Sequence, residues 1–347
     1  RKERVVMNNI KIEVQNGDSY ENISNMTLRY ISSINFIIPT KNILELEKII
    51  YTWVRIGATG ACIWGRPRLG KTYAVQYITD GIHKKFGDNF PVLIWNITDH
   101  ADTERNFYAS ILLALGYSIN LAYRMNTALV LKEKLLNILE TMACDTPHRK
   151  IIFMIDEAWK LCDKDFSWLM DLYNNLNNKD VQLVCFLFGT RELKDLKNEF
   201  KLRGKDQIVG RFMIYEKQFM GINNKSELAF CLSAFDSLHM VNSNRLELQE
   251  TIKEYYFPNA HKNQSFFNLA DDYWNAFQSV KAKYNIIAED IPMKYLIDSF
   301  NICLYLFGID SITPVVFPTL EELIESIEFS GYGESDDEYE HKKKHRR

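Results

Sequence analysis

The residues with the clearest chemical signature are Gly65-Arg66-Pro67-Arg68-Leu69-Gly70-Lys71-Thr72. They fit the pattern G-x-x-x-x-G-K-[ST], in which glycines let backbone N–H groups approach phosphate oxygens closely. Lys71 can place a positive charge beside the terminal phosphates, and the Thr72 hydroxyl can bind Mg²⁺. The pattern predicts that residues 65–72, with the following Tyr73, bind ATP and that Lys71 assists its chemistry.

The sequence around this loop has the context that the pattern requires. Ala61-Cys62-Ile63-Trp64 is an apolar run typical of a buried strand, and Tyr73–Ile78 has the apolar spacing of a helix. A helix that begins at the loop would turn the positive end of its dipole toward an anion. The alternative is a chance glycine-rich turn, which would need neither the strand nor the helix.

A second segment, Lys150–Glu157, places two carboxylates after an apolar run. A continuous apolar run is expected of a parallel strand that is buried on both faces, and its carboxyl end opens into the crevice where such sheets bind ligands. Asp156 can hold the Mg²⁺ shell, and Glu157 can polarise the attacking water. The alternative is a strand that merely ends in a solvated acidic pair.

The composition bounds the function classes. The chain has 347 residues, 46% of them apolar and 25% charged, the balance of a globular protein with no apolar stretch of membrane-spanning length. The N-terminus lacks the apolar region of a signal peptide. Six cysteines without a C-x-x-C pair predict a reduced, cytoplasmic protein without a zinc site. The net charge of −3 gives no global argument for nucleic-acid binding.

The order of predicted elements indicates an α/β fold. Strands and helices alternate up to about residue 220, which predicts a central parallel sheet flanked by helices. The predicted strands are 61–64, 90–97, 150–155, 181–188 and 211–215, and the predicted helices are 40–55, 73–78, 103–115, 127–142 and 166–176. Beyond residue 220 we expect helices alone, at 226–238, 244–256, 265–284, 292–306 and 320–329.

This organisation predicts four regions. Residues 1–27 form a polar, irregular N-terminal arm, and 28–220 form the nucleotide-binding core. Residues 221–330 form an α-helical C-terminal region that includes a lid. Residues 331–347 form a disordered tail, because blocks of like charge seldom fold.

Thr190 follows the strand that ends at Phe188-Gly189. In AAA+ ATPases, a polar residue at the tip of the strand beside the acidic strand orients the water or senses the γ-phosphate, and Thr190 is the candidate here. The alternative is a simple Gly-Thr turn.

Arg211 is the candidate for a residue that acts on a neighbouring subunit. In AAA+ proteins an Arg just before the last core strand projects onto the neighbour's γ-phosphate and stabilises charge in the transition state. Arg203 is the reserve candidate, and the alternative for either is an ordinary surface arginine.

Taken together, the phosphate loop, Ile155-Asp156-Glu157-Ala158, Phe188-Gly189-Thr190-Arg191-Glu192 and Gly210-Arg211-Phe212 resemble the TnsC/TniB group of AAA+ transposition regulators. The resemblance covers roughly residues 28–220 and implies an AAA+ P-loop ATPase with ATP and Mg²⁺ as cofactors. It also implies a homo-oligomer on double-stranded DNA, a ring or helical filament of about six or seven subunits per turn. Its partners would be a TniQ/TnsD-like target selector and a TnsB/TnsA-like transposase in the bacterial cytoplasm, with no membrane.

For contacts with DNA phosphates the sequence offers Thr103, Arg105, Arg124 and Thr127, which lie near the starts of two predicted helices. Their alternative role is that of helix caps and surface polar residues. Two other functions stay open: an AAA+ helicase loader or replication initiator, and a signalling switch NTPase in which DNA has no part.

Overall fold

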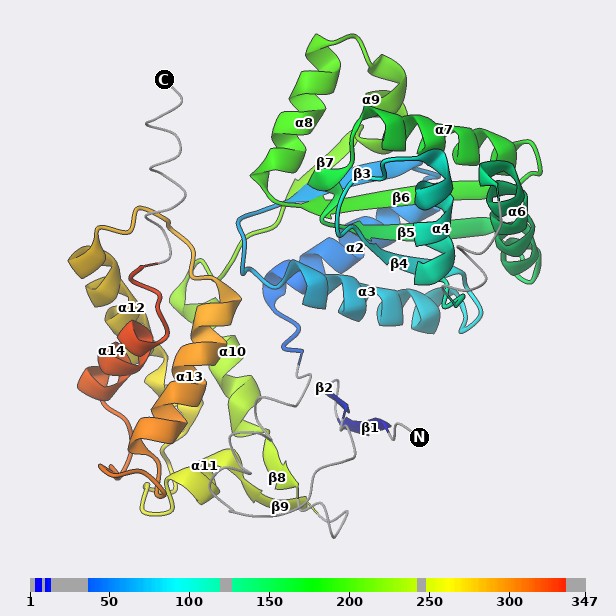
Figure 1. The fold of residues 1–347 in the computed structure, drawn as a ribbon. Coiled ribbons are helices and arrows are strands. Elements are labelled where there is room, and N and C mark those ends of the chain that lie inside the picture. Colours follow the sequence, from blue (N-terminus) through cyan, green and yellow to red (C-terminus); the bar gives the residue numbers. More distant parts are fainter. Residues whose placement is uncertain (1–3, 8–9, 14–36, 119–126, 242–247, 335–347) are drawn as a thin grey trace. The chain divides into compact units, whose positions relative to one another are not determined.

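A computed structural model describes residues 4–7, 10–13, 37–118, 127–241 and 248–334 (Figure 1). The chain divides into two compact units. The first, here called the sheet unit, comprises Asn42–Pro67 and Lys71–Phe219. The second, the C-terminal unit, comprises Arg1–Lys41, Arg68–Gly70 and Met220–Arg347.

The sheet unit is built on five parallel strands in the order β4-β5-β6-β3-β7. The strands are β3 (Gly60–Trp64), β4 (Val92–Asn96), β5 (Lys150–Asp156), β6 (Gln182–Gly189) and β7 (Tyr215–Gln218). The predicted central parallel sheet is confirmed. Strand β6 lies between β3 and β5, so the strand before the phosphate loop and the strand that ends in Asp156 are not neighbours.

Helices cover both faces of this sheet (Figure 1). They are α2 (Lys41–Arg55), α3 (Lys71–Phe86), α4 (Glu104–Ala114), α6 (Ala128–Cys144), α7 (Asp163–Asn177), α8 (Arg191–Leu202) and α9 (Asp206–Phe212), with a 3₁₀ turn η1 (Ala158–Lys160). On β6, Cys185 and Leu187 join the core cluster formed with α4, α6, α7 and α9, whereas the intervening Phe186 stacks on Trp53 of α2. Since successive residues of a strand point to opposite faces, both faces are buried, which explains the continuous apolar runs.

The predicted strand at residues 211–215 is wrong. Residues Asp206–Phe212 form helix α9, and the last strand begins only at Tyr215. Ile208, Val209 and Phe212 are buried at helical spacing, and the Phe212 ring packs against the ring of Tyr173. Packing on one face of a short helix therefore overrides the strand propensity of a run that is rich in Phe, Ile and Tyr.

The C-terminal unit is mainly helical, with α10 (Lys225–Asp236), α11 (Ile252–Tyr256), η2 (Phe266–Leu269), α12 (Ala270–Tyr284), α13 (Met293–Phe307) and α14 (Leu320–Phe329). Its core holds many aromatic rings, among them Phe235 of α10 and Phe300 of α13, which stack at 3.8 Å between centroids. No helix among the described residues is long and apolar enough to cross a membrane.

Two expectations outside the sheet need correction, and a third is not tested. Strands do not stop at residue 220, because β8 (His239–Val241) and β9 (Leu248–Thr251) pair antiparallel where part of a helix was predicted. The N-terminal arm is not wholly irregular, since β1 (Arg4–Met7) pairs antiparallel with β2 (Ile10–Glu13). Most of the predicted charged tail, residues 335–347, lies outside the described residues.

Candidate functional site

The phosphate loop connects the end of β3 to the start of α3 at Lys71. Gly70 has a φ of 93°, a left-handed backbone that glycine adopts without strain, and Arg68 has a φ of 66°. The N–H of Gly65 donates to the carbonyl of Gly189 at 3.2 Å, which ties the loop to the end of β6. The backbone therefore follows the curved path that the sequence pattern predicts for a loop around phosphates.

Lys71 is 7% exposed and points back into this loop. Its ammonium donates to the carbonyls of Gly65 at 3.1 Å and Arg66 at 2.7 Å. Burial lowers the pKa of Lys71 from its ordinary value, while the charges of Glu157, Asp156 and Glu192 act in the opposite direction. The ammonium is held where it can meet an anion that enters the loop.

Thr72, in the first turn of α3, and Asp156, at the end of β5, are brought together although β3, the strand before the loop, is not adjacent to β5. The Thr72 hydroxyl donates to Oδ2 of Asp156 at 2.7 Å, and the backbone N–H of Glu157 donates to Oδ1 of the same carboxylate at 2.9 Å. A hydroxyl has one hydrogen and two lone pairs, so this bond leaves the lone pairs of Thr72 available to a cation. The oxygen atoms of Thr72 and Asp156 thus form the hard donor set that Mg²⁺ prefers.

Glu157 adopts a left-handed backbone, with φ 56° and ψ 32°, at the start of the η1 turn. The indole N–H of Trp159 donates to its Oε2 at 2.6 Å. This fixes the carboxylate and leaves Oε1 as an acceptor. Trp159 belongs to none of the sequence motifs; the available signal was a side-chain donor two residues after the second carboxylate.

Thr190 lies at the end of β6, between the strands that carry the loop and the acids. Its hydroxyl is buried and has no hydrogen-bond partner among the described residues. The preceding Gly189 is in close contact with Trp159, since an added Cβ would lie 3.3 Å from Cδ1 of that indole. A buried polar atom without a partner is costly, so this hydroxyl fits a site that is completed by a ligand or water.

A cluster of Glu216, Trp64 and Lys197, which the sequence did not reveal, links β7 to the residue before the phosphate loop. Glu216 accepts from the Trp64 indole at 2.7 Å and from the Lys197 ammonium at 2.9 Å. Lys197 is 5% exposed and forms an ion pair with Glu216. Burial alone would raise the pKa of Glu216, but hydrogen bonds from Lys197 and Trp64 and the charges of Lys197 and Lys194 bring it below its ordinary value.

The other loop residues differ in exposure. Leu69 is buried, whereas Pro67 and Arg68 are exposed, and Tyr73 is 50% exposed. Arg68 groups with the C-terminal unit, where its guanidinium donates to the Tyr295 hydroxyl.

Arg211 is not brought to the phosphate loop of its own chain. Its carbonyl accepts from Thr59, which directly precedes β3 and so lies at the end of that strand opposite the loop. Its guanidinium lies 4.8 Å from the centre of the Tyr173 ring and donates to the Asn174 side chain. The reserve candidate, Arg203, instead forms an ion pair with Asp163 at 2.6 Å.

Two of the residues suggested for DNA contact cap helices of the sheet unit. Thr103 caps α4 by accepting from the N–H of Asn106, and Thr127 caps α6 by accepting from the N–H of Val130. Arg105 is partly buried, and Arg124 lies outside the described residues. Both threonines therefore have the structural role that was their alternative.

The sequence around this site matches a known domain family. Residues 55–196 match the family model of an AAA domain. The sheet unit has an AAA+ P-loop fold. No curated protein matches the chain. The AAA domain match spans the phosphate loop, Asp156, Glu157 and Thr190, so these residues lie within a nucleotide-binding fold.

Several solved structures resemble the chain at low identity. The Aeropyrum pernix ORC2 protein in ADPNP-ADP complexes is 12% identical over 87% of this chain and 71% of that one, with a TM-score of 0.47. The Drosophila ORC bound to DNA is 15% identical over 90% and 68%, with a TM-score of 0.49. CDC6P from Pyrobaculum aerophilum is 14% identical over 84% and 79%, with a TM-score of 0.40. At these values the likenesses say nothing about what this chain binds.

Proposed function

We propose that this AAA+ protein binds and hydrolyses ATP with Mg²⁺ and uses the nucleotide state to control its assembly. The observation that supports this most directly is the hydrogen bond between Thr72 and Asp156, which joins the phosphate loop to the acidic strand across β6. Glu157 follows at once and is fixed by Trp159. A scaffold that only binds nucleotide would not need this second, positioned carboxylate.

The residues present fit Mg²⁺ and ATP. Residues Gly65–Tyr73 would surround the phosphates, with Lys71 as the buried cation, and Thr72 and Asp156 would supply oxygen donors to Mg²⁺. The metal would neutralise negative charge on the phosphates. Glu157 would accept a proton from a water, and the unpaired Thr190 hydroxyl would orient that water or the terminal phosphate.

The finer proposal is that the protein regulates DNA transposition in the bacterial cytoplasm. It would assemble on duplex DNA and connect a TniQ/TnsD-like target selector to a TnsB/TnsA-like transposase. Support comes from the resemblance of its motifs to the TnsC/TniB group. The position of Arg211 is compatible with action on a neighbouring subunit, because its backbone lies at the sheet edge opposite its own loop. Arg211 would have to exchange Asn174 and Tyr173 for the neighbour's phosphate.

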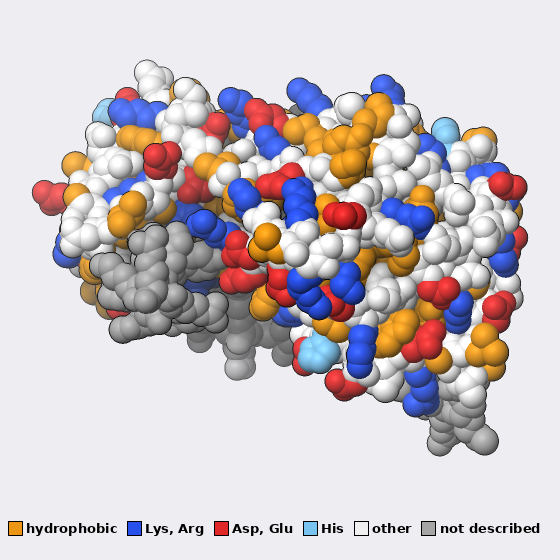
Figure 2. Space-filling view, turned by 90° about the horizontal axis from the view of Figure 1, so that it is seen from above, with side chains coloured by type: hydrophobic (Ala, Val, Ile, Leu, Met, Phe, Trp, Pro, Cys, Tyr) orange, Lys and Arg blue, Asp and Glu red, His pale blue; other side chains and the backbone are white. Residues whose placement is uncertain are grey.

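Positive and negative side chains are mixed on the surface of the molecule. On the face shown in Figure 2, blue Lys and Arg side chains lie interspersed with red Asp and Glu side chains. With a net charge of −3, a DNA-binding surface would have to be gathered from several subunits. This favours binding that depends on assembly and therefore on ATP.

The test combines hydrolysis with imaging. Purified protein is mixed with duplex DNA and either a slowly hydrolysed ATP analogue or ADP, and the particles are examined by negative-stain electron microscopy. We expect rings or filaments with the analogue and few with ADP. Arg211→Ala should abolish assembly, whereas Arg203→Ala, which removes an exposed arginine with an intramolecular partner, should retain it.

The outcomes separate the alternatives. Hydrolysis with monomers in every mixture would contradict the assembly proposal and favour the signalling switch. Assembly on DNA with capture of a replicative helicase, rather than of a transposase, would favour a helicase loader. Absence of hydrolysis under every condition would overturn the ATPase itself.

A further inference from the structure

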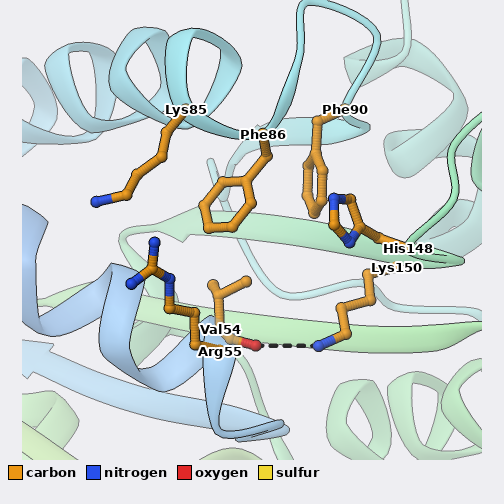
Figure 3. A pocket seen from close by; sticks show the side chains of 7 residues that line it. All are labelled: Val54, Arg55, Lys85, Phe86, Phe90, His148 and Lys150. Atoms are coloured by element: carbon orange, nitrogen blue, oxygen red, sulfur yellow. Dashed lines mark hydrogen bonds between the residues drawn. The ribbon is translucent and has the colours of Figure 1, made fainter.

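A pocket of about 440 Å³ lies at the amino edge of the sheet, away from the ends of the strands that carry the phosphate loop and the acids. Its lining comes from three places: the end of α2, the end of α3 with the turn that follows it, and the start of β5 (Figure 3). The lining residues are Val54, Arg55, Lys85, Phe86, Phe90, His148 and Lys150. Its volume is in the range of small-molecule sites.

The lining of this pocket carries an excess of positive charge. Arg55, Lys85 and Lys150 supply three cations, and the lining contains no carboxylate. Figure 3 shows the guanidinium of Arg55 and the ammonium of Lys85 on the same side of the pocket. Among the described parts of the chain, no ion pair joins any of the three cations to an acid, although the Lys85 ammonium lies 4.0 Å from the centre of the Tyr51 ring. Cations that converge without a counter-ion repel one another unless an anion joins them.

Capping of α2 does not account for these cations. Basic side chains often interact with the free carbonyls at the C-terminus of a helix. Here the last carbonyls of α2 already accept from the backbone: Thr52 from Ile56, Trp53 from Ala58 and Val54 from Gly57. Lys150 adds one bond to the Val54 carbonyl at 3.0 Å and keeps its other N–H donors. Arg55 is therefore not needed as a cap.

Aromatic rings form another part of the lining (Figure 3). Phe86 lies 5.3 Å from Phe90 and 5.9 Å from the His148 ring, between centroids. Phe90 is buried, whereas Phe86 is half-buried and borders both the cations and the other rings (Figure 3). Cations beside an accessible aromatic ring are the combination that holds the backbone and bases of unpaired nucleic acid.

We infer that this pocket binds a nucleotide unit, with the phosphate held by Arg55, Lys85 and Lys150 and the base against Phe86. The three cations come from different elements, and a tetrahedral phosphate can accept bonds from several directions, whereas a carboxylate accepts mainly in one plane. The nucleotide unit has two possible sources: a free mononucleotide or an unpaired nucleotide of a single strand. This inference does not depend on ATP hydrolysis at the phosphate loop.

The test measures binding in a Lys71→Ala background, which weakens binding at the phosphate loop. The probes are a fluorescent AMP and a fluorescein-labelled oligothymidylate, each measured by anisotropy. The added double variant Arg55→Gln/Lys85→Gln should weaken binding by about tenfold or more, because two charge-assisted hydrogen bonds are lost. Its matched control is Lys48→Gln/Lys84→Gln, which removes exposed cations from the same two helices outside the pocket and should stay within about twofold.

A second arm tests the ring. Phe86→Leu should weaken binding of the base-containing probe by about fivefold or more and leave binding of inorganic pyrophosphate unchanged. Binding of AMP assigns the pocket to a free nucleotide, and binding of the oligothymidylate alone assigns it to a single strand. Equal losses in the pocket and control variants would overturn the inference, as would binding of neither probe. A synthetic acidic peptide with the sequence of residues 334–340, Glu-Ser-Asp-Asp-Glu-Tyr-Glu, is a further probe. Binding of this peptide, with no binding of either nucleotide probe, would also overturn the inference.

Discussion

The two edges of the parallel sheet differ in the balance of their charged side chains. At the carboxyl edge, Lys71 is buried near the carboxylates of Asp156 and Glu157, and Asp156 accepts bonds from Thr72 and from the backbone. At the amino edge, Arg55, Lys85 and Lys150 line a pocket that contains no acid. The carboxyl edge pairs its cation with carboxylates, whereas the three cations of the amino edge have only neutral partners, such as the Val54 carbonyl for Lys150 and the Tyr51 ring for Lys85.

This difference indicates what each edge requires from outside. A preorganised set of charges and dipoles needs little rearrangement when a reaction develops charge, which suits the hydrolysis proposed for the carboxyl edge. An unbalanced set of cations gains most from an anion that binds and stays. Substitutions at the carboxyl edge should therefore change rate and stability, whereas those at the amino edge should change only affinity.

The largest expected effect is at Glu157. Glu157→Gln removes the proposed base and should lower the rate of ATP hydrolysis about 10²- to 10⁴-fold, with ATP binding retained. Phosphate release and nucleotide binding are measured on the same sample. Glu133→Gln changes an exposed carboxylate of α6 and is the control, for which we expect nearly parental hydrolysis. A Glu157→Gln variant that hydrolyses ATP at the parental rate would remove the assignment of the base.

The next effect is on stability. Glu216→Ala leaves the buried Lys197 ammonium without its carboxylate and should lower the free energy of unfolding by about 2 kcal/mol, less than for a fully buried pair because Glu216 is partly exposed. Urea denaturation measures the change. The double variant Lys197→Met/Glu216→Leu should recover part of the loss, since no charge is then left buried alone. Equal losses in both variants would indicate that packing, rather than charge, is responsible.

A smaller effect is expected at Trp159. Trp159→Phe keeps the ring against Gly189 but removes the N–H that holds Glu157, and should lower kcat about three- to tenfold with KM unchanged. Steady-state hydrolysis measures both constants. The change Trp168→Phe at a partly buried position of α7 serves as a control for loss of an indole elsewhere in the sheet unit. A change confined to KM would mean that Trp159 affects nucleotide binding instead of positioning the base.

The smallest expected effect is on stability at the amino edge, at Arg55 and Lys85. Arg55→Gln and Lys85→Gln should each alter the free energy of unfolding by less than about 0.5 kcal/mol, because neither cation has a carboxylate partner to lose. Their unfolding curves are compared with that of Glu216→Ala. A loss at Arg55 as large as that at Glu216 would show that the amino edge also has internal partners for its cations.

The sheet could be predicted from the sequence because its strands are buried on both faces and leave continuous apolar runs. The end of helix α9 at Phe212, within the predicted strand 211–215, could not be predicted, because the Phe212 ring packs against Tyr173, a residue far away in the sequence. The hairpin of β8 and β9 interrupts a region whose apolar spacing resembles that of helices. Short elements of this kind depend on partners that a local pattern does not contain.

The site shows the same limit. Lys71, Thr72 and Asp156 belong to motifs with fixed spacing, and the sequence alone named them. Trp159 and Glu216 act through single hydrogen bonds that depend on the fold, and Trp64 lies 152 positions from Glu216. For Arg211 the sequence gives a position near the last strand, and the structure adds the contacts with Tyr173 and Asn174.

The left-handed backbone of Glu157 lowers the stability of the folded chain at the same residue that is proposed to act in hydrolysis. A non-glycine residue in this region costs about 1 kcal/mol or more, and the side chain at this position is the one proposed to take the proton. Glu157→Gly would relieve that strain and remove the base together. Selection of random variants for heat resistance alone should therefore enrich Glu157→Gly, a variant that no longer hydrolyses ATP. The variants that survive the highest temperatures would then include the least active ones.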